Sequence, residues 1–236
     1  MAYAGRLDPM ASGKLLVLIG DECKRQTLYH DLDKGYLFSV LFGVSSDTAD
    51  PLGRLQFDAA PTLNYSDVQR VVRSISRTIT LPYPHFSAKT VKGKPLHTWT
   101  LEGRLDEIDI PKKRSTVYSL SCSKLEYIST EEIVQIATSK ITTVSPVTDP
   151  RKKLGNDFRR TDVLADWNRF AATHQNEQYP IATFSCTASS GTYMRSLAEY
   201  IAKQCDSRGL AWSIHRTHIG KYAVLTRKLG FWYSTY

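Results

Sequence analysis

The sequence lacks the long apolar stretches that would place a protein in a membrane. No run approaches the roughly 18 consecutive apolar residues that a membrane-spanning helix needs. The first residues have neither the apolar core of a signal peptide nor the acid-free composition of a transit peptide. These absences argue against membrane-spanning and secreted classes, so we predict a soluble, cytoplasmic protein without a membrane partner.

Cysteine is scarce as well, with four residues scattered over the chain and no Cys-x-x-Cys pair. Without a secretory signal, this spacing favours buried thiols over disulfides or zinc ligands. We therefore expect neither a metal site nor a bound cofactor. The four cysteines are Cys23, Cys122, Cys186 and Cys205.

What the sequence does contain is an excess of positive charge, with 31 Lys and Arg against 23 Asp and Glu and a formal net charge of +8. This balance favours a polyanionic partner, which would be bound through phosphate contacts and counterion release. The excess is strongest in residues 151–160, where five basic side chains accompany one Asp. Two interpretations remain open: a solvated loop, or an insertion that grips phosphates through Arg151, Lys152 and Lys153.

The pattern of apolar residues predicts strands and helices in mixed order. Because the elements show no regular βαβ alternation, we predict an α+β fold on a largely antiparallel sheet flanked by helices. Capping boxes at Ser66 with Gln69 and at Ser129 with Glu132 predict two helix starts. The expected strands lie at residues 15–20, 36–43, 86–103, 115–123, 181–189 and 211–225, the further helices after residue 20 and at 161–175 and 193–205, and an exposed loop at 141–160.

A short motif near the start carries the main functional signal. Residues 5–13 have the sequence Gly-Arg-Leu-Asp-Pro-Met-Ala-Ser-Gly and lead into an apolar strand that ends in Gly-Asp-Glu-Cys-Lys. Taken alone, Asp8-Pro9 is typical of a helix N-cap followed by proline at the first helical position. Three further blocks follow, and the four in this order resemble the TruB family of pseudouridine synthases. The residues of the later blocks are Tyr36, Asp47, Thr48, Asp50 and Gly53, then Pro84, Ser87, Ala88, Gly93 and Leu96, and then Ser189, Gly191, Thr192, Tyr193 and Arg195.

The resemblance implies that residues 1–236 form a pseudouridine synthase catalytic domain, with a basic insertion at about 141–180. Such an enzyme isomerises one uridine in the T arm (TΨC loop) of tRNA by breaking the C1′–N1 bond, turning the base and rejoining it through C5. The resemblance selects Asp8 as the catalytic carboxylate. Attack of Asp8 on the nucleotide and removal of a ribose proton to form a glycal both remain open.

Further roles follow from the same resemblance. Arg195 matches an arginine that pairs with the carboxylate, and a cation beside Asp8 would keep it ionised. Tyr36 matches the tyrosine that stacks on the base and has been assigned a role in moving the C5 proton. The alternatives are a surface arginine and a core aromatic. Because a stacked uridine must be flipped out and held against aromatic surface, a substrate-binding set is expected at the site. Its members are Tyr3, Arg6 and Tyr193, together with Arg151, Lys152 and Lys153.

The sequence also departs from the family pattern. Tyr3 stands where the family has a histidine, Thr90 where it has a lysine, and His97 where it has a tyrosine. The family's opening strand motif and its C-terminal RNA-binding domain have no counterpart here. We therefore expect that Met1 is not the native start, or that the sheet has an open edge.

Two other functions fit the same residues. One is a pseudouridine synthase that acts on ribosomal RNA or is guided by a small RNA. The other is a non-catalytic protein that binds and folds tRNA. The blocks around Ser87 and Ser189 fit TruB better than the ribosomal branches, and intact Asp8, Tyr36 and Arg195 favour turnover. We expect tRNA as the partner and no obligate protein partner.

Overall fold

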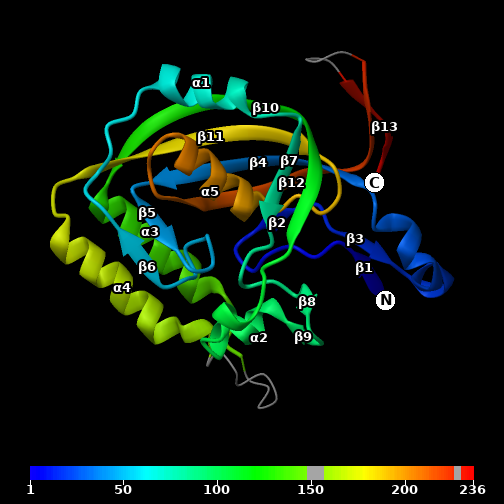
Figure 1. Ribbon diagram of the computed structural model, residues 1–236, viewed down its shortest axis with the longest axis horizontal. Coiled ribbons are helices and arrows are strands. Elements are labelled where there is room, and N and C mark those ends of the chain that lie inside the picture. Colours follow the sequence, from blue (N-terminus) through cyan, green and yellow to red (C-terminus); the bar gives the residue numbers. More distant parts are fainter. Residues whose placement is uncertain (148–156, 226–229) are drawn as a thin grey trace.

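A computed structural model, which describes residues 1–147, 157–225 and 230–236, shows a curved sheet with helices on both faces (Figure 1). The strand order is β13-β12-β4-β11-β10-β7, every neighbour in that order is antiparallel, and short β2 pairs parallel to β12. The predicted α+β fold on a largely antiparallel sheet is confirmed. The strands are β2 (Ser12–Gly13), β4 (Asp33–Phe42), β7 (Thr78–Pro82), β10 (Lys112–Ser129), β11 (Gln178–Ala188), β12 (Gly209–Val224) and β13 (Gly230–Thr235).

Smaller strand pairs and helices complete the described part of the chain. Strands β1 and β3 pair with each other beside the N-terminal motif, β5 pairs with β6, and β8 pairs with β9. Their bounds are β1 (Ala2–Ala4), β3 (Leu16–Leu18), β5 (Val44–Ser46), β6 (Leu55–Phe57), β8 (Thr90–Val91) and β9 (Lys94–Pro95). The helices are η1 (Gly20–Tyr29), α1 (Tyr65–Ser74), α2 (Leu96–Leu101), η2 (Leu105–Glu107), α3 (Thr130–Thr143), η4 (Asp157–Arg159), α4 (Arg160–Thr173) and α5 (Met194–Gln204).

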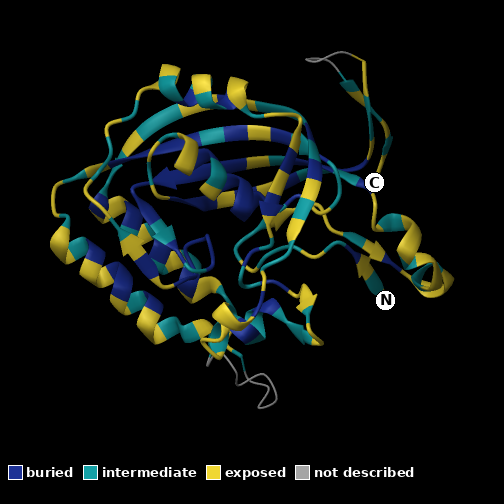
Figure 2. Cartoon of the chain, in the orientation of Figure 1, coloured by how far each residue is buried: buried dark blue, intermediate teal, exposed yellow. Residues whose placement is uncertain are grey.

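Two hydrophobic clusters hold the helices to opposite faces of the sheet, because successive side chains of a strand point to opposite faces. On β4, Phe38, Val40 and Phe42 are buried in the cluster that also contains apolar residues of α1 and α5. Leu41 belongs to the other cluster, with residues of α3 and α4. Figure 2 shows buried residues along the central strands and α5, and exposed residues on the outer sides of α1 and α4.

Helices α3 and α4 follow one another between β10 and β11 and cover the second face (Figure 1). The predicted helix at 161–175 is present as α4. Both predicted bounds of the exposed loop at 141–160 are wrong, because α3 continues to Thr143 and η4 begins at Asp157. Arg160 explains the difference: its guanidinium donates to the carbonyls of Ile141 and Val144 at the end of α3. Residues 151–153 lie outside the described residues.

One of the two helix starts predicted from the capping boxes is confirmed. Ser129 caps α3, with its hydroxyl accepting from Glu132 N at 3.2 Å. The start at Ser66 is wrong, because α1 begins at Tyr65 and its N-cap is Asn64, whose side-chain oxygen accepts from Asp67 N at 3.0 Å. An Asn directly before the first helical residue is as good a cap as Ser.

The alternating segment 86–103 was expected to form strands. Only β8 and β9 do, and α2 occupies Leu96–Leu101. Leu96 and Trp99 are both buried there, three residues apart, which is helical spacing.

All four cysteines are free thiols, Cys122 and Cys186 buried and the other two partly exposed. Within the described ranges, no helix is both long and apolar enough to cross a membrane.

Candidate active site

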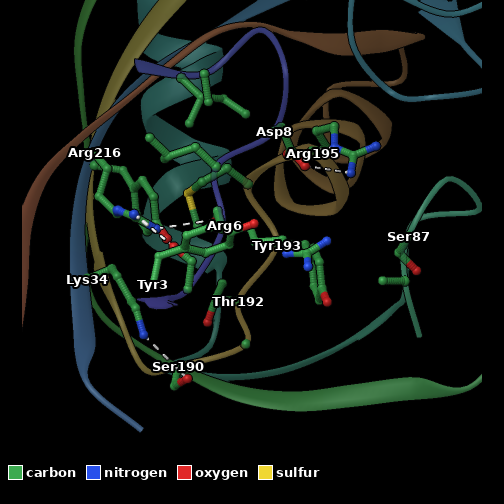
Figure 3. A pocket seen from close by; sticks show the side chains of 18 of the residues that line it. Tyr3, Arg6, Asp8, Lys34, Ser87, Ser190, Thr192, Tyr193, Arg195 and Arg216 are labelled. Carbon is green, nitrogen blue, oxygen red and sulfur yellow. Dashed lines mark hydrogen bonds and ion pairs between the residues drawn. The ribbon is translucent and has the colours of Figure 1, made fainter. Parts of the chain in front are cut away.

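A cavity of about 680 Å³ opens where three of the sequence blocks meet the N-terminal motif. Its wall includes the loop from Gly5 to Asp8, the start of β4 at Lys34 and Tyr36, the segment 86–88, and the turn 190–195 that enters α5 (Figure 3). Residues that are far apart in the chain therefore line one chamber, which could hold a flipped nucleotide.

Asp8 and Arg195 form a bidentate ion pair at this cavity (Figure 3). Arg195 Nε donates to Asp8 Oδ2 at 2.8 Å and Nη2 donates to Oδ1 at 2.9 Å. The arginine side chain is 5% exposed and the carboxylate 31% exposed, so the carboxylate can meet a ligand while its partner stays covered. Burial by itself would lower the pKa of Arg195, but Asp8 and Asp50 outweigh it and keep that pKa above its ordinary value. The ion pair expected from the sequence is present.

The remaining donors of Arg195 bind backbone. Nη1 donates to Thr48 O at 2.8 Å, and Nη2 also donates to Phe86 O at 3.2 Å. Asp50 Oδ2 lies 3.8 Å from Nε. The fork is thereby fixed in plane and direction by two carbonyls and two carboxylates, which a planar guanidinium suits.

The loop 47–53, which supplies Thr48 O and Asp50, is held by hydrogen bonds of its own. Asp50 Oδ1 accepts from Thr48 Oγ1 at 2.7 Å and from Leu52 N at 2.9 Å. Burial raises the pKa of Asp50, although Arg195 and these hydrogen bonds act against the rise. A Cβ at Gly53 would lie 2.4 Å from Thr48 Oγ1, so the turn requires glycine there. The Asp-Thr-x-Asp-x-x-Gly block therefore supports the site without lining the cavity.

Arg216 of β12 holds the loop that carries Asp8. This side chain is 2% exposed; its Nε donates to Lys14 O at 2.7 Å and its Nη2 to Gly5 O at 3.0 Å. It thus clamps the loop on both sides of Asp8, while Ala11 N donates to Asp8 O at 2.9 Å and closes a turn. No helix follows Asp8, so the N-cap alternative is wrong.

The two predicted active-site tyrosines both line the cavity. Burial raises the pKa of Tyr36 to about 12, despite the opposing charge and hydrogen bond of Arg216. Burial also raises the pKa of Tyr193, whose ring meets Tyr83 edge-on with centroids 5.4 Å apart. Both phenols are therefore neutral near pH 7 and offer an aromatic face and a hydroxyl.

Tyr3 and Arg6 lie at the cavity as well. Tyr3 is 45% exposed, and its carbonyl accepts from Gln26 Nε2 at 2.8 Å. The guanidinium carbon of Arg6 lies 5.6 Å from the Tyr3 ring centroid. Figure 3 shows the two side chains beside each other. The structure thus brings six of the predicted residues to one cavity, whereas Arg151, Lys152 and Lys153 lie outside the described residues.

Sequence reasoning missed three further residues of the cavity wall: Lys34, Ser87 as a functional group, and Arg216. Lys34 Nζ donates to Leu32 O and lies 3.5 Å from Ser190 Oγ (Figure 3). Lys34 could have been inferred, because it precedes Tyr36 by two residues and so shares its face of the strand. Ser87 Oγ is buried and, among the described residues, is the one such side-chain atom without a hydrogen-bond partner.

Residues 1–144, more than half of the chain, match the family model described as TruB family pseudouridylate synthase (N terminal domain). The chain belongs to the TruB family.

Within the described ranges, no group of three or more His, Cys, Asp or Glu side chains is arranged to hold a metal ion.

Named relatives agree with this assignment. The tRNA pseudouridine synthase B of Caldicellulosiruptor saccharolyticus is 26% identical over 224 residues, which cover 95% of this chain and 59% of that relative. The tRNA pseudouridine synthase 4 of Saccharomyces cerevisiae is 27% identical over 231 residues, with 88% and 57% covered. The tRNA pseudouridine synthase B of Caldanaerobacter subterraneus is 34% identical over 127 residues, with 53% and 44% covered. The chain spans between 44% and 59% of the length of these relatives.

A solved structure shares the fold. A crystal structure of a Cbf5-Nop10-Gar1 complex contains a chain that superposes with a TM-score of 0.51 at 13% identity, covering 92% of this chain and 40% of that one. At this identity the likeness concerns the fold alone.

Proposed function

We propose that this protein isomerises uridine to pseudouridine in tRNA, at a uridine of the T arm. The observation that carries the proposal is the Asp8 carboxylate, held in a fixed plane by Arg195 and partly exposed to a cavity that two neutral tyrosines also line. Relatives named as tRNA pseudouridine synthases support tRNA as the substrate. The net charge of +8 suits such a polyanion.

Each proposed role follows from the residue's position. Asp8 either attacks the nucleotide or removes a ribose proton, and Arg195 keeps it ionised and aligned while the C1′–N1 bond breaks. Tyr36 and Tyr193 hold the free base between breakage and rejoining through C5. Because the pKa of Tyr36 is about 12, its phenol serves as a proton-bearing partner. The unpartnered hydroxyl of Ser87 is available to bind the base or the ribose.

Entry of the nucleotide requires that it leave the stack of the RNA. Tyr3 and Arg6, together at the cavity, present an aromatic face and a cation to that step. Tyr3 stands where the family pattern has a histidine to which displacement of the base is attributed. We propose that stacking on Tyr3 takes the place of that displacement.

The direct test incubates the purified chain with unmodified tRNA transcripts and, in parallel, with unmodified ribosomal RNA transcripts. Carbodiimide labelling followed by primer extension maps pseudouridine at single-nucleotide resolution. A single new site in the T arm supports the proposal. A site in ribosomal RNA instead of tRNA would identify the other synthase function, and tight tRNA binding with no pseudouridine in any RNA would identify an RNA-folding protein.

Lys34 should make RNA binding depend on pH. Burial, with the nearby Arg216 as the second cause, lowers the pKa of Lys34 to about 8. The side chain is cationic below that pH and neutral above it, so the cavity loses a positive charge as the pH rises from 7 to 9.5. We expect tRNA affinity to fall by about threefold to tenfold over this range. Fluorescence anisotropy checks this, and in Lys34→Met the fall should be smaller; an equal fall would assign the pH dependence to other groups.

The basic segment gives a second expectation. If residues 151–153 grip phosphates, replacing all three by Ala should flatten the dependence of log Kd on log salt concentration by at most about three units. The modified nucleotide should stay the same, because phosphate contacts position the RNA without distinguishing its bases. Binding isotherms at several salt concentrations measure the slope, and an unchanged slope would favour the solvated-loop interpretation.

A further inference from the structure

Arg159, at the start of α4, makes a bidentate ion pair with the loop that supports the site. Its Nη1 lies 2.5 Å from Asp47 Oδ2 and its Nη2 lies 3.0 Å from Oδ1. The arginine side chain is 20% exposed and that of Asp47 32% exposed, so the pair is partly shielded from water. Asp47 directly precedes Thr48, whose carbonyl accepts from Arg195. Arg159 therefore holds the residue next to one of the two carbonyls that orient the guanidinium of Arg195.

The guanidinium of Arg159 also contacts Phe86, the residue that bears the second carbonyl. The Arg159 Cζ atom lies 4.5 Å from the centroid of the Phe86 ring, within the range of a cation–π contact. Phe86 O is the other backbone acceptor of Arg195. Arg159 thus joins the Thr48 segment to the Phe86 segment from outside the site, in addition to the hydrogen bonds by which Arg195 joins the two segments within it.

Helix α4 contacts the 47–55 region at further points, among them the ion pairs of Arg54 with Asp162 and Asp166. Trp167 Nε1 donates to Pro51 O at 3.0 Å, and Asp166 Oδ2 accepts from Leu55 N at 3.0 Å. These contacts hold the body of the loop and do not reach Phe86. Arg159, by contrast, touches both carbonyl-bearing segments.

The backbone around Arg159 is held in an unfavourable conformation. Asp157, Phe158 and Arg159 have φ values of 52°, 57° and 55°, and side-chain-bearing residues rarely adopt this region. Such backbone persists where surrounding contacts fix it, and it is concentrated at functional sites. Here Asp157 is fixed by Arg160 and by Val147 N, while Arg159 is turned toward the Asp47 loop.

We propose that Arg159 is a positioning residue for the Asp8–Arg195 ion pair, through which the start of helix α4 controls the alignment of the catalytic carboxylate. This inference rests on the proposed function. Without Arg159, the Thr48 and Phe86 carbonyls lose the brace between them, and the plane of the Arg195 fork is free to rotate. A carboxylate displaced by about 1 Å loses roughly 100-fold in rate.

The test compares Arg159→Ala and Arg159→Lys with Arg169→Ala. Arg169 lies on α4, carries the same charge and is 57% exposed, so its removal controls for the loss of one cation. Its ion-pair partner Asp166 remains bound by Arg54 and by Leu55 N. In single-turnover assays with enzyme in excess, Arg159→Ala should convert uridine about 10- to 100-fold more slowly than wild type. Its tRNA Kd should stay within about threefold of the Arg169→Ala value. Arg159→Lys should be intermediate, since an ammonium cannot bind both oxygens of Asp47 and cover Phe86 together.

Two further measurements test whether Arg159 acts through Asp47 and Arg195. In the double variant Arg159→Ala with Asp47→Ala, the loss of rate should be smaller than the product of the two single losses, because both changes remove the same Arg159–Asp47 ion pair. In ¹⁵N-arginine-labelled protein, the Nε–H resonance of Arg195, assigned through its absence in Arg195→Lys, should shift in Arg159→Ala and stay in place in Arg169→Ala.

The outcomes separate this inference from the proposed function. A wild-type protein that forms no pseudouridine would refute the function, while the Arg195 resonance would still test the brace without any turnover. An Arg159→Ala variant with a wild-type rate would overturn the inference. If only its Kd rose, Arg159 would be an RNA contact and the inference would fail as well. If Arg159→Ala does not fold, the rate and resonance of Arg159→Lys decide in the same way.

Discussion

Asp8→Asn is expected to abolish pseudouridine formation while leaving tRNA binding within a few-fold of wild type. The amide has nearly the shape of the carboxylate, but it is neither a nucleophile nor a base, and it places an NH₂ group against one donor of Arg195. We expect a rate below about a thousandth of wild type in single-turnover assays. The alternative in which the protein binds and folds tRNA without turnover would leave the cellular pseudouridine content unchanged by the substitution.

A matched control is Asp21→Asn, which makes the same change at a carboxylate that is 94% exposed on η1. This variant should keep its rate and its affinity. If Asp8→Asn retained more than about a thousandth of the rate, another carboxylate would have to be active. The nearest candidate, Asp50, is 3% exposed, and one of its oxygens is already bound by Thr48 and Leu52.

The sheet could be predicted because its signal is local. The central strands β4, β11 and β12 are rich in β-branched and aromatic residues, and their alternation places Phe38 and Leu41 on opposite faces. Helices with a strongly apolar side, such as α5, were equally evident. Local signals failed where the composition was equally compatible with a strand and with a helix, as in α2. There, the burial of Leu96 and Trp99, three residues apart, favours the helix.

The candidate site could be predicted only as far as the sequence blocks extend. They identify Asp8 and Arg195, which are 187 residues apart yet within hydrogen-bonding distance. Arg216 was missed because its contacts with Gly5 and Lys14 span more than 200 residues and follow from the pairing of β2 with β12. No local pattern marks a strand arginine as buried.

The role inferred for Arg159 lay beyond sequence reasoning for a different reason. The charge of residues 151–160 favoured either a solvated loop or a phosphate grip, and both assume that the cations face outward. Arg159 instead turns inward to Asp47 and Phe86. That direction depends on three consecutive residues with positive φ, none of them glycine, a conformation that their residue types disfavour.

Arg195→Lys is expected to be nearly as damaging as loss of Asp8, although it conserves the charge. The guanidinium serves Asp8 with two N–H groups, Thr48 O with a third, and Phe86 O at the same time. An ammonium has three donors at one point and cannot reach acceptors spread around a plane. We expect a rate at least about 100-fold lower in single-turnover assays, with tRNA affinity little changed.

Arg195→Lys should also lower the thermal stability of the protein, and Arg208→Lys is the matched control for this effect. Each buried carbonyl left without a donor costs about 1–3 kcal/mol, so Arg195→Lys should melt several degrees below wild type. Arg208→Lys makes the same substitution at an exposed pair with Asp58, where ion pairs contribute little, and should match wild type in melting temperature and rate. Assays well below the melting temperature separate misalignment from unfolding. A near-normal rate for Arg195→Lys under these conditions would show that charge alone suffices beside Asp8 and would remove Arg195 from the proposed mechanism.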